Sequence, residues 1–136
     1  MLNKKTQYAF QALMYLAENQ NSGPVLIAEI ADTKKIPLKF LENILLELRK
    51  AGILESKKGK GGGYFLNLPP SKIRLADIIR KIDGPIAMLP CASLYFYKRC
   101  SNCDEKNCGL HDTMIEVRDA TLKILEGKTV ADLVKK

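Results

Sequence analysis

Four cysteines and one histidine are the residues of this chain best suited to metal or redox chemistry. They are gathered in one short segment and are Cys91, Cys100, Cys103, Cys108 and His111. In a reducing compartment such a cluster indicates metal binding or thiol redox chemistry before it indicates disulfides. Thiolates bind iron–sulfur clusters and zinc alike, so the residue types alone leave the metal open.

The spacing of this cluster, Cys-x8-Cys-x2-Cys-x4-Cys-x2-His, is compatible with several kinds of site. Zinc could be held by Cys100, Cys103, Cys108 and His111, because Cys-x2-Cys followed by Cys-x2-His is ordinary zinc-site spacing. Cys91 would then take no part. Without a metal, Cys100 and Cys103 could form a thiol–disulfide switch. The cysteines could also bind nothing.

Basic side chains are the second group with a chemical role to explain. The formal net charge is +7, and residues 34–60 hold eight basic and three acidic residues, 8 − 3 = +5 of that total. A small basic protein favours a polyanionic partner, most often nucleic acid. The eight basic residues are Lys34, Lys35, Lys39, Arg49, Lys50, Lys57, Lys58 and Lys60.

Apolar periodicity predicts the elements that must position these residues. Helical stripes indicate helices over residues 6–18, 27–34, 38–51, 75–82 and 111–125, and a short last helix over 130–134. Pro37 suits the start of the third helix and Gly52 its end. Short strand patterns over 53–56 and 64–66 enclose a tip with three lysines and the run Gly61-Gly62-Gly63. Such a glycine run suits unusual φ values or a close backbone approach.

Two short helices joined by a tight turn and followed by a hairpin predict a winged helix-turn-helix. The expected fold class is mainly α with a small β-hairpin wing, plus a C-terminal dimerisation helix. The third helix can enter a major groove while the lysine-rich tip neutralises phosphates, and Lys34 and Lys35 are expected phosphate contacts. We expect a DNA-binding domain at 1–84, a cysteine-rich sensor loop at 85–110, and the dimerisation helix with a short last helix at 111–136.

Other classes of protein fit this sequence poorly. No apolar run approaches the ~20 residues of a membrane span, and the N-terminus has no secretory apolar region, so we expect a cytoplasmic protein without a membrane partner. We do not expect an enzyme, because the Cys-x2-Cys lies outside any βαβ unit and no carboxylate pair has a catalytic spacing. The glycine run lacks the Lys-Ser/Thr ending of a nucleotide-phosphate loop.

Three segments of the chain resemble the Rrf-two family of bacterial winged-helix transcription regulators. They are YAFQALMYLA, IPLKFLENILLELRKAGILESKKGKGGGYFL and IRLADIIRKIDG, in the family's order. The resemblance implies a homodimer on a near-palindromic double-stranded DNA operator, with the 111–125 helix pairing the subunits. It also implies that Lys39 and Glu42 face bases, and that Lys58 stands where IscR-type members have a minor-groove arginine. Lysine suits a narrow minor groove less well than arginine, so the operator sequence does not carry over.

The resemblance further implies a [2Fe–2S] iron–sulfur cluster that senses redox, iron or nitric oxide status. IscR-type members use three cysteines and a histidine, spaced Cys-x5-Cys-x5-Cys-x2-His. Here Cys91 and the ending Cys108-x2-His111 match, whereas the middle is five residues longer and offers both Cys100 and Cys103. The preferred ligand set is Cys91, Cys103 and Cys108, with His111 or Cys100 as the fourth. Some relatives add an acidic ligand near the N-terminus, where this chain has Gln7.

Overall fold

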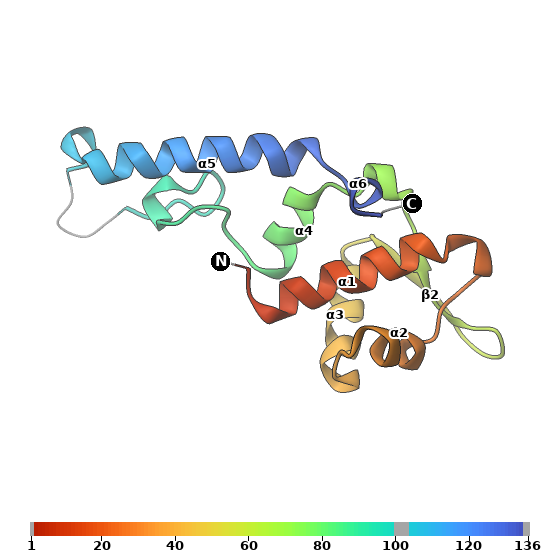
Figure 1. Cartoon of the computed structure of the whole chain (residues 1–136). Coiled ribbons are helices and arrows are strands. Elements are labelled where there is room, and N and C mark those ends of the chain that lie inside the picture. The colour runs from red at the N-terminus through yellow and green to blue at the C-terminus, as the bar shows by residue number, and fades with distance from the viewer. Residues whose placement is uncertain (1, 100–103, 135–136) are drawn as a thin grey trace.

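The computed structural model describes residues 2–99 and 104–134, and it confirms the predicted mostly helical fold with a two-strand hairpin (Figure 1). The helices are α1 (Lys4–Glu18), α2 (Ile27–Lys34), α3 (Leu38–Lys50), α4 (Leu75–Ile82), α5 (Gly109–Gly127) and α6 (Val130–Leu133). The strands are β1 (Leu54–Lys57) and β2 (Gly63–Leu66), and short 3-10 turns cover Gln20–Ser22, Pro70–Lys72, Pro90–Ala92 and Glu105–Asn107. No helix within these described ranges is long and apolar enough to cross a membrane.

The N-terminal helix α1 is fixed at its start by side-chain hydrogen bonds. The Asn3 side chain accepts from the backbone N–H of Thr6 at 2.8 Å and thereby satisfies a donor that has no partner within the helix. The fully buried Thr6 hydroxyl donates to Asp83 just after α4 at 3.0 Å, and Asp83 also accepts from the Asn3 N–H at 3.0 Å. These bonds tie the first turn of α1 to the end of α4.

One hydrophobic core joins α1, α2, α3, the hairpin and α4. Its members follow the helical spacing predicted from the sequence, because apolar residues three and four apart share one face of a helix. The last helix α6 returns to this core through Val130, which is fully buried. The largest fully buried apolar side chains are Leu13, Ile30, Leu41, Ile44, Leu45, Leu48, Leu54, Ile78 and Val130.

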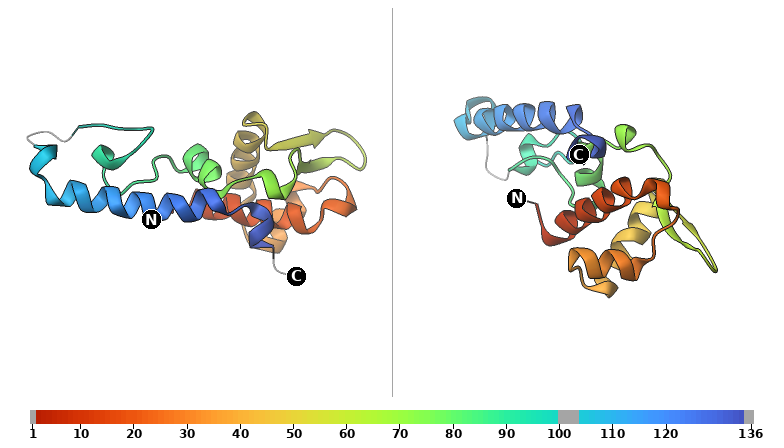
Figure 2. Two further views of the ribbon diagram at one scale, coloured as in Figure 1. Left: turned by 90° about the horizontal axis from the view of Figure 1, so that it is seen from above. Right: turned by 45° about the vertical axis from the view of Figure 1, so that its right-hand side comes forward.

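The long helix α5 touches this core near its end, through Leu125, and otherwise lies outside it. It runs along one edge of the molecule beside residues 85–99, whereas α2, α3 and the hairpin lie at the opposite edge (Figures 1 and 2). Of its nineteen residues only Leu122 is buried, at 6% exposure. Most of its apolar side chains are therefore left accessible in a single chain.

Most predicted boundaries are confirmed to within two residues, and the deviations have local causes. The first helix starts at Lys4 and not near Thr6, because Asn3 is its cap. The last long helix starts at Gly109 and not at His111, because the Cys108 side chain caps it. The hairpin strands lie one residue away from the predicted positions, with Leu54 paired to Leu66 and Lys57 to Gly63.

Lys35 ends α2 in a left-handed conformation, with φ 56° and ψ 46°. A residue with a β-carbon is roughly 1–2 kcal/mol less stable than glycine in this conformation. Glycine offsets part of that gain, because it increases the conformational entropy of the unfolded chain. We expect Lys35→Gly to raise the free energy of unfolding by about 0.5–1 kcal/mol. Urea unfolding followed by circular dichroism measures the change. The matched variant Lys34→Gly lies inside the last helical turn and should lower the free energy of unfolding by about 1 kcal/mol. If both variants changed the free energy of unfolding in the same direction, the left-handed conformation of Lys35 would be contradicted.

Candidate nucleic-acid interface and cysteine site

Helices α2 and α3 form a helix-turn-helix whose turn is Lys35-Ile36-Pro37. Ile36 is buried and anchors the turn in the core, while Lys35 and Pro37 are exposed. Tyr15 of α1 fixes α2 by donating a hydrogen bond from its hydroxyl to the Glu29 carboxylate, which raises the pKa of Tyr15. The angle at which α3 leaves the turn is thus set by buried and hydrogen-bonded neighbours.

The two faces of α3 differ in character. Leu41, Ile44, Leu45 and Leu48 point into the core. The opposite face carries Lys39, Asn43, Leu46 and Lys50, all exposed and spaced i, i+4, i+7 and i+11 along one line. Glu42 is also exposed and borders this line. A helix that presents cationic, amide and methyl groups along one line has the group types that contact DNA phosphates and base edges.

The hairpin is held to the rest of the fold by its own backbone. Beyond the β1–β2 pairing, Tyr64 and Val25 exchange two backbone hydrogen bonds of 2.8 Å each, so Val25, two residues before α2, forms an antiparallel bridge to β2. Gly63 lies at this crossing, with φ 142°. A β-carbon there would come within 2.3 Å of the Val25 carbonyl oxygen. The close approach expected of the glycine run is therefore confirmed at Gly63.

The basic residues predicted for DNA lie on α2, its turn, α3 and the wing. Lys35, Lys39, Lys57, Lys58 and Lys60 are exposed. Lys34 is half-buried instead, with its Nζ 5.9 Å from the centre of the Tyr15 ring. Its stem therefore packs against α1, although its charge remains at the same edge of the molecule.

The wing tip gives a quantitative expectation for DNA binding. Lys58 directly follows β1 at the wing tip, and its side chain is exposed. Each phosphate neutralised releases about one counterion. Lys58→Ala should therefore reduce the magnitude of the negative slope of log K against log salt by about 1. Titrations of one duplex at several salt concentrations measure this slope. The control Lys123→Ala, on α5, should leave it unchanged, and an equal decrease would show a charge effect unrelated to the wing.

His111 contacts two of the other metal candidates, Cys91 and Cys108, at the start of α5. Cys91 is 4% exposed within the Pro90–Ala92 turn. The Nδ1 of His111 lies 3.3 Å from the Cys91 Sγ, and the backbone N–H of His111 donates to the Cys108 Sγ at 3.4 Å. His111 thus contacts one cysteine through its ring and the other through its backbone.

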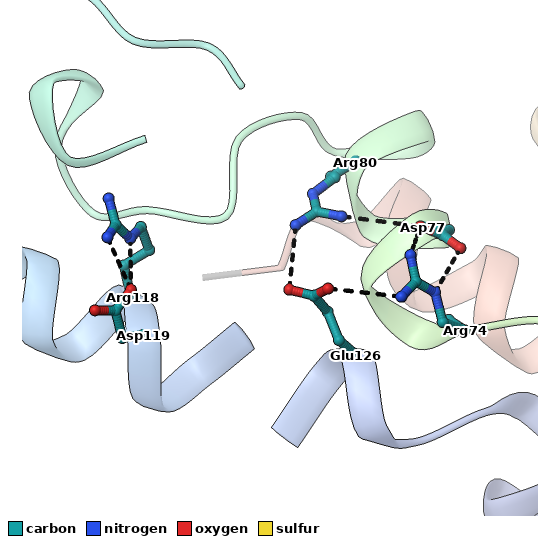
Figure 3. A network of polar contacts seen from close by, with 6 residues as sticks. All are labelled: Arg74, Asp77, Arg80, Arg118, Asp119 and Glu126. Carbon is teal, nitrogen blue, oxygen red and sulfur yellow. Dashed lines mark hydrogen bonds and ion pairs between the residues drawn. The ribbon is translucent and has the colours of Figure 1, made fainter. Parts of the chain in front are cut away.

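The turn that carries Cys91 is fixed to α5 by an arginine. Arg118 donates to the backbone carbonyl of Ala92 at 3.0 Å, and its other guanidinium nitrogens bind the Asp119 carboxylate at 2.8 and 2.9 Å. Figure 3 shows this pair at the middle of the helix. Because Ala92 follows Cys91 directly, α5 positions this cysteine as well as Cys108.

The other two candidates, Cys100 and Cys103, lie outside the described residues. Among residues 2–99 and 104–134, no three Cys, His, Asp or Glu side chains converge closely enough to hold a metal ion. The described donors have the types that iron–sulfur clusters and zinc require, but they do not complete a ligand set by themselves. Neither the predicted five-candidate site nor its preferred set is therefore tested by the geometry.

Asn43 is a candidate for the interface that the sequence analysis did not include. Asn43 occupies the middle of the exposed line on α3, between Lys39 and Leu46. The helical period of the sequence indicates its exposure, because Asn43 lies on the face of the helix opposite to Leu41, Ile44 and Leu48. An uncharged amide does not contribute to a count of basic residues, so charge alone does not indicate it.

Comparison with known proteins gives matches over nearly the whole chain. A family model named Rrf2, described as an iron-dependent transcriptional regulator, matches residues 2–136. An rrf2-like helix-turn-helix transcriptional regulator of Rhodobacter capsulatus is 40% identical, over 98% of this chain and 92% of the relative. The regulator IscR of Escherichia coli is 31% identical, over 98% of this chain and 79% of IscR.

A solved structure matches the fold at similar coverage. CymR (YrzC), the global cysteine regulator of B. subtilis, aligns with a TM-score of 0.80 and 29% sequence identity. The alignment covers 98% of this chain and 95% of CymR. The similarity therefore includes the α5 region as well as the winged domain.

Proposed function

Because this chain belongs to the Rrf2 (Rrf-two) family of transcriptional regulators, we propose that it binds an operator as a homodimer and that its cysteine site controls that binding. The predicted family and winged-helix fold are confirmed, and the family is one of DNA-binding regulators and not of enzymes. Such a regulator works where the chromosome is, so we propose a cytoplasmic location.

The exposed line on α3 is the observation that carries the proposed DNA contact. Helix α3 and the wing lie next to each other on the side of the molecule away from α5, which brings a groove-sized helix and a cationic hairpin together (Figure 2). We assign Lys39, Glu42 and Asn43 to base edges, and Lys34, Lys35, Lys57, Lys58 and Lys60 to phosphates. Specificity then comes from α3, and most of the salt-dependent affinity comes from the lysines.

Selection of operators from a random duplex library tests this assignment. We expect a two-fold symmetric consensus whose half-sites are separated by about one helical turn, 10 base pairs centre to centre. Binding should weaken steeply with salt. Failure to enrich any sequence, with binding that depends on salt alone, would contradict sequence-specific regulation.

An apolar stripe on α5 supports the homodimer. Leu110, Val117 and Ile124 are 58%, 38% and 58% exposed and are spaced seven residues apart. A seven-residue apolar repeat is the pattern of helices that pair along their length. A two-fold dimer of this kind would present two copies of α3 to a palindromic site.

Ile124→Glu is expected to separate the subunits, because it puts a charge in the middle of a buried contact. Sedimentation should then give the mass of one chain, and operator affinity should decrease at least tenfold, which corresponds to about 1.4 kcal/mol. Lys123→Glu adds the same side chain at an adjacent exposed position outside the stripe and should remain dimeric. A dimeric Ile124→Glu protein would place the interface elsewhere.

We propose that the cysteine site holds an iron–sulfur cluster, [2Fe–2S] in type. Cys91, Cys108 and His111 supply suitable donors at the start of α5, and Cys103 or Cys100 would complete the set. When bound, the cluster supplies one-electron redox chemistry and sensitivity to iron supply or nitric oxide. The chain's own contribution is to hold the Cys91 turn and the Cys108 cap against one helix, through Arg118 and the His111 N–H.

Two other occupancies of the site are distinguished by one measurement. Protein purified without oxygen is analysed for visible absorbance, iron, acid-labile sulfide and zinc. Absorbance between roughly 320 and 460 nm with stoichiometric iron and sulfide supports the cluster. Colourless protein with one zinc per chain would indicate a structural metal. Colourless, metal-free protein would leave a thiol–disulfide switch, and either result would contradict the cluster.

A further inference from the structure

The guanidinium of Arg80 lies where α4, α5 and the cysteine-bearing segment meet. Its side chain is 16% exposed, with NH1 3.8 Å from the Asp77 carboxylate on α4 and NH2 3.7 Å from the Glu126 carboxylate on α5 (Figure 3). The ring of Tyr95 covers the guanidinium, with 4.5 Å between the Arg80 Cζ and the ring centre. One side chain thus contacts α4, the long helix α5 and Tyr95 of the segment that follows the Cys91 turn.

The polar contacts of Arg80 are looser than those of its neighbour Arg74. Arg74 makes two hydrogen bonds of 3.0 and 3.1 Å to Asp77 and also lies 3.6 Å from Glu126. The two arginines therefore share the same two carboxylates. The NH2 of Arg80 is buried without a hydrogen bond to any residue that the structure describes, and its ion pairs exceed hydrogen-bond length. The Tyr95 ring consequently contributes much of what holds this guanidinium in place.

Tyr95 is joined to Cys91 through a compact turn. The Lys98 N–H donates to the Pro90 carbonyl at 3.1 Å, and the Phe96 N–H donates to the buried Ser93 side chain at 3.0 Å. These bonds close residues 90–98 into one unit. Tyr95 is itself 69% exposed, so core packing does not hold its ring in place. A rearrangement around Cys91 would therefore move the ring relative to Arg80.

We propose that Arg80 is the positioning residue through which the Cys91 turn sets the placement of the winged domain against α5. The inference rests on the proposed function, because it assumes that the cysteine site controls DNA binding. When the ring covers Arg80, the guanidinium bridges Asp77 and Glu126 and holds α4 against α5. When the turn rearranges, the Tyr95 ring no longer covers Arg80. The contacts of Arg80 with Asp77 and Glu126 then weaken, and the two carboxylates pair with Arg74 alone. In a dimer paired through α5, the two α3 helices would change their separation.

A double-mutant cycle tests the coupling without knowledge of the bound ligand. Operator affinity is measured by fluorescence anisotropy for wild type, Cys91→Ser, Tyr95→Leu and the double variant, on a duplex selected by the wild-type protein. We expect Cys91→Ser to change affinity at least fivefold in the wild-type background and less than twofold in the Tyr95→Leu background. Tyr95→Phe keeps the ring and should restore the full effect of Cys91→Ser.

A second readout is independent of DNA. The chain contains no tryptophan, so Tyr95→Trp places a single indole over Arg80. Its emission should shift when Cys91→Ser is added, and Arg80→Gln should produce a similar shift by itself. If the ring had only a structural role, Tyr95→Leu would lower thermal stability, and the effect of Cys91→Ser on operator affinity would be the same with and without the ring.

The outcomes separate this inference from the function on which it rests. If Cys91→Ser changes affinity equally with and without the Tyr95 ring, the role of Arg80 is overturned and control by the cysteine site stands. If Cys91→Ser changes nothing in the wild-type background, both control by the cysteine site and the role of Arg80 are overturned. DNA binding by α3 and the wing would survive either result.

Discussion

Replacing Gly63 by alanine is expected to lower the free energy of unfolding by about 3–5 kcal/mol and to detach the wing from the core. The added β-carbon would lie 2.3 Å from the Val25 carbonyl oxygen and 2.9 Å from the Val25 nitrogen. Neither atom can move far, because the backbone of Val25 is hydrogen-bonded to Tyr64 in both directions. The φ of 142° adds strain that alanine cannot relieve. Urea unfolding followed by circular dichroism measures the loss.

Gly61→Ala is the matched control for this effect. Gly61 lies in the same tip and also has a positive φ, 76°, but a β-carbon there would meet no atom within 4 Å. We expect only the left-handed strain, about 1–2 kcal/mol. Equal losses at the two positions would show that conformation alone matters, and that the Val25 contact does not anchor the wing. DNA binding by Gly63→Ala should also lose the contribution of the wing lysines.

The hairpin illustrates what the sequence can and cannot predict. The strands and the glycine-rich tip follow from local pattern, because alternating apolar residues and glycine have strong local preferences. The pairing of Tyr64 with Val25 joins residues 39 positions apart and has no local signature. The glycine run therefore indicated that a close approach was present, but the partner became known only from the fold.

The cysteine site shows the same division between local and distant contacts. Residue types and spacing place Cys108 and His111 on one helical turn, which is a local relation. The 3.3 Å contact between Cys91 and His111 spans twenty positions of sequence and depends on where the Pro90–Ala92 turn packs against α5. Arg80 had no signal beyond an amphipathic helix, because its carboxylate partner Glu126 lies 46 positions away. Long-range polar contacts of this kind are set by tertiary packing.

Asn43 is the residue whose removal should most change the choice of operator. An asparagine amide can donate to and accept from the N6 and N7 of adenine at once, and such a pair discriminates by about 1–3 kcal/mol. Asn43 is exposed and central on α3, with Lys39 one turn before it and Leu46 one turn after it. We expect Asn43→Ala to weaken binding to the selected operator by roughly 10–100-fold.

The effect of Asn43→Ala should separate specificity from general affinity. Because asparagine carries no charge, the salt slope and the binding to random duplex should stay at wild-type values. Lys57→Ala removes a proposed phosphate contact and should instead reduce the magnitude of the slope by about 1. A repeated selection with Asn43→Ala should lose preference at one position of each half-site and keep the others. Asn21→Ala, an exposed asparagine outside α3, should change none of these quantities. An unchanged consensus with Asn43→Ala would mean that α3 lies in the groove with a different face, because the central residue of the line would then contact no base.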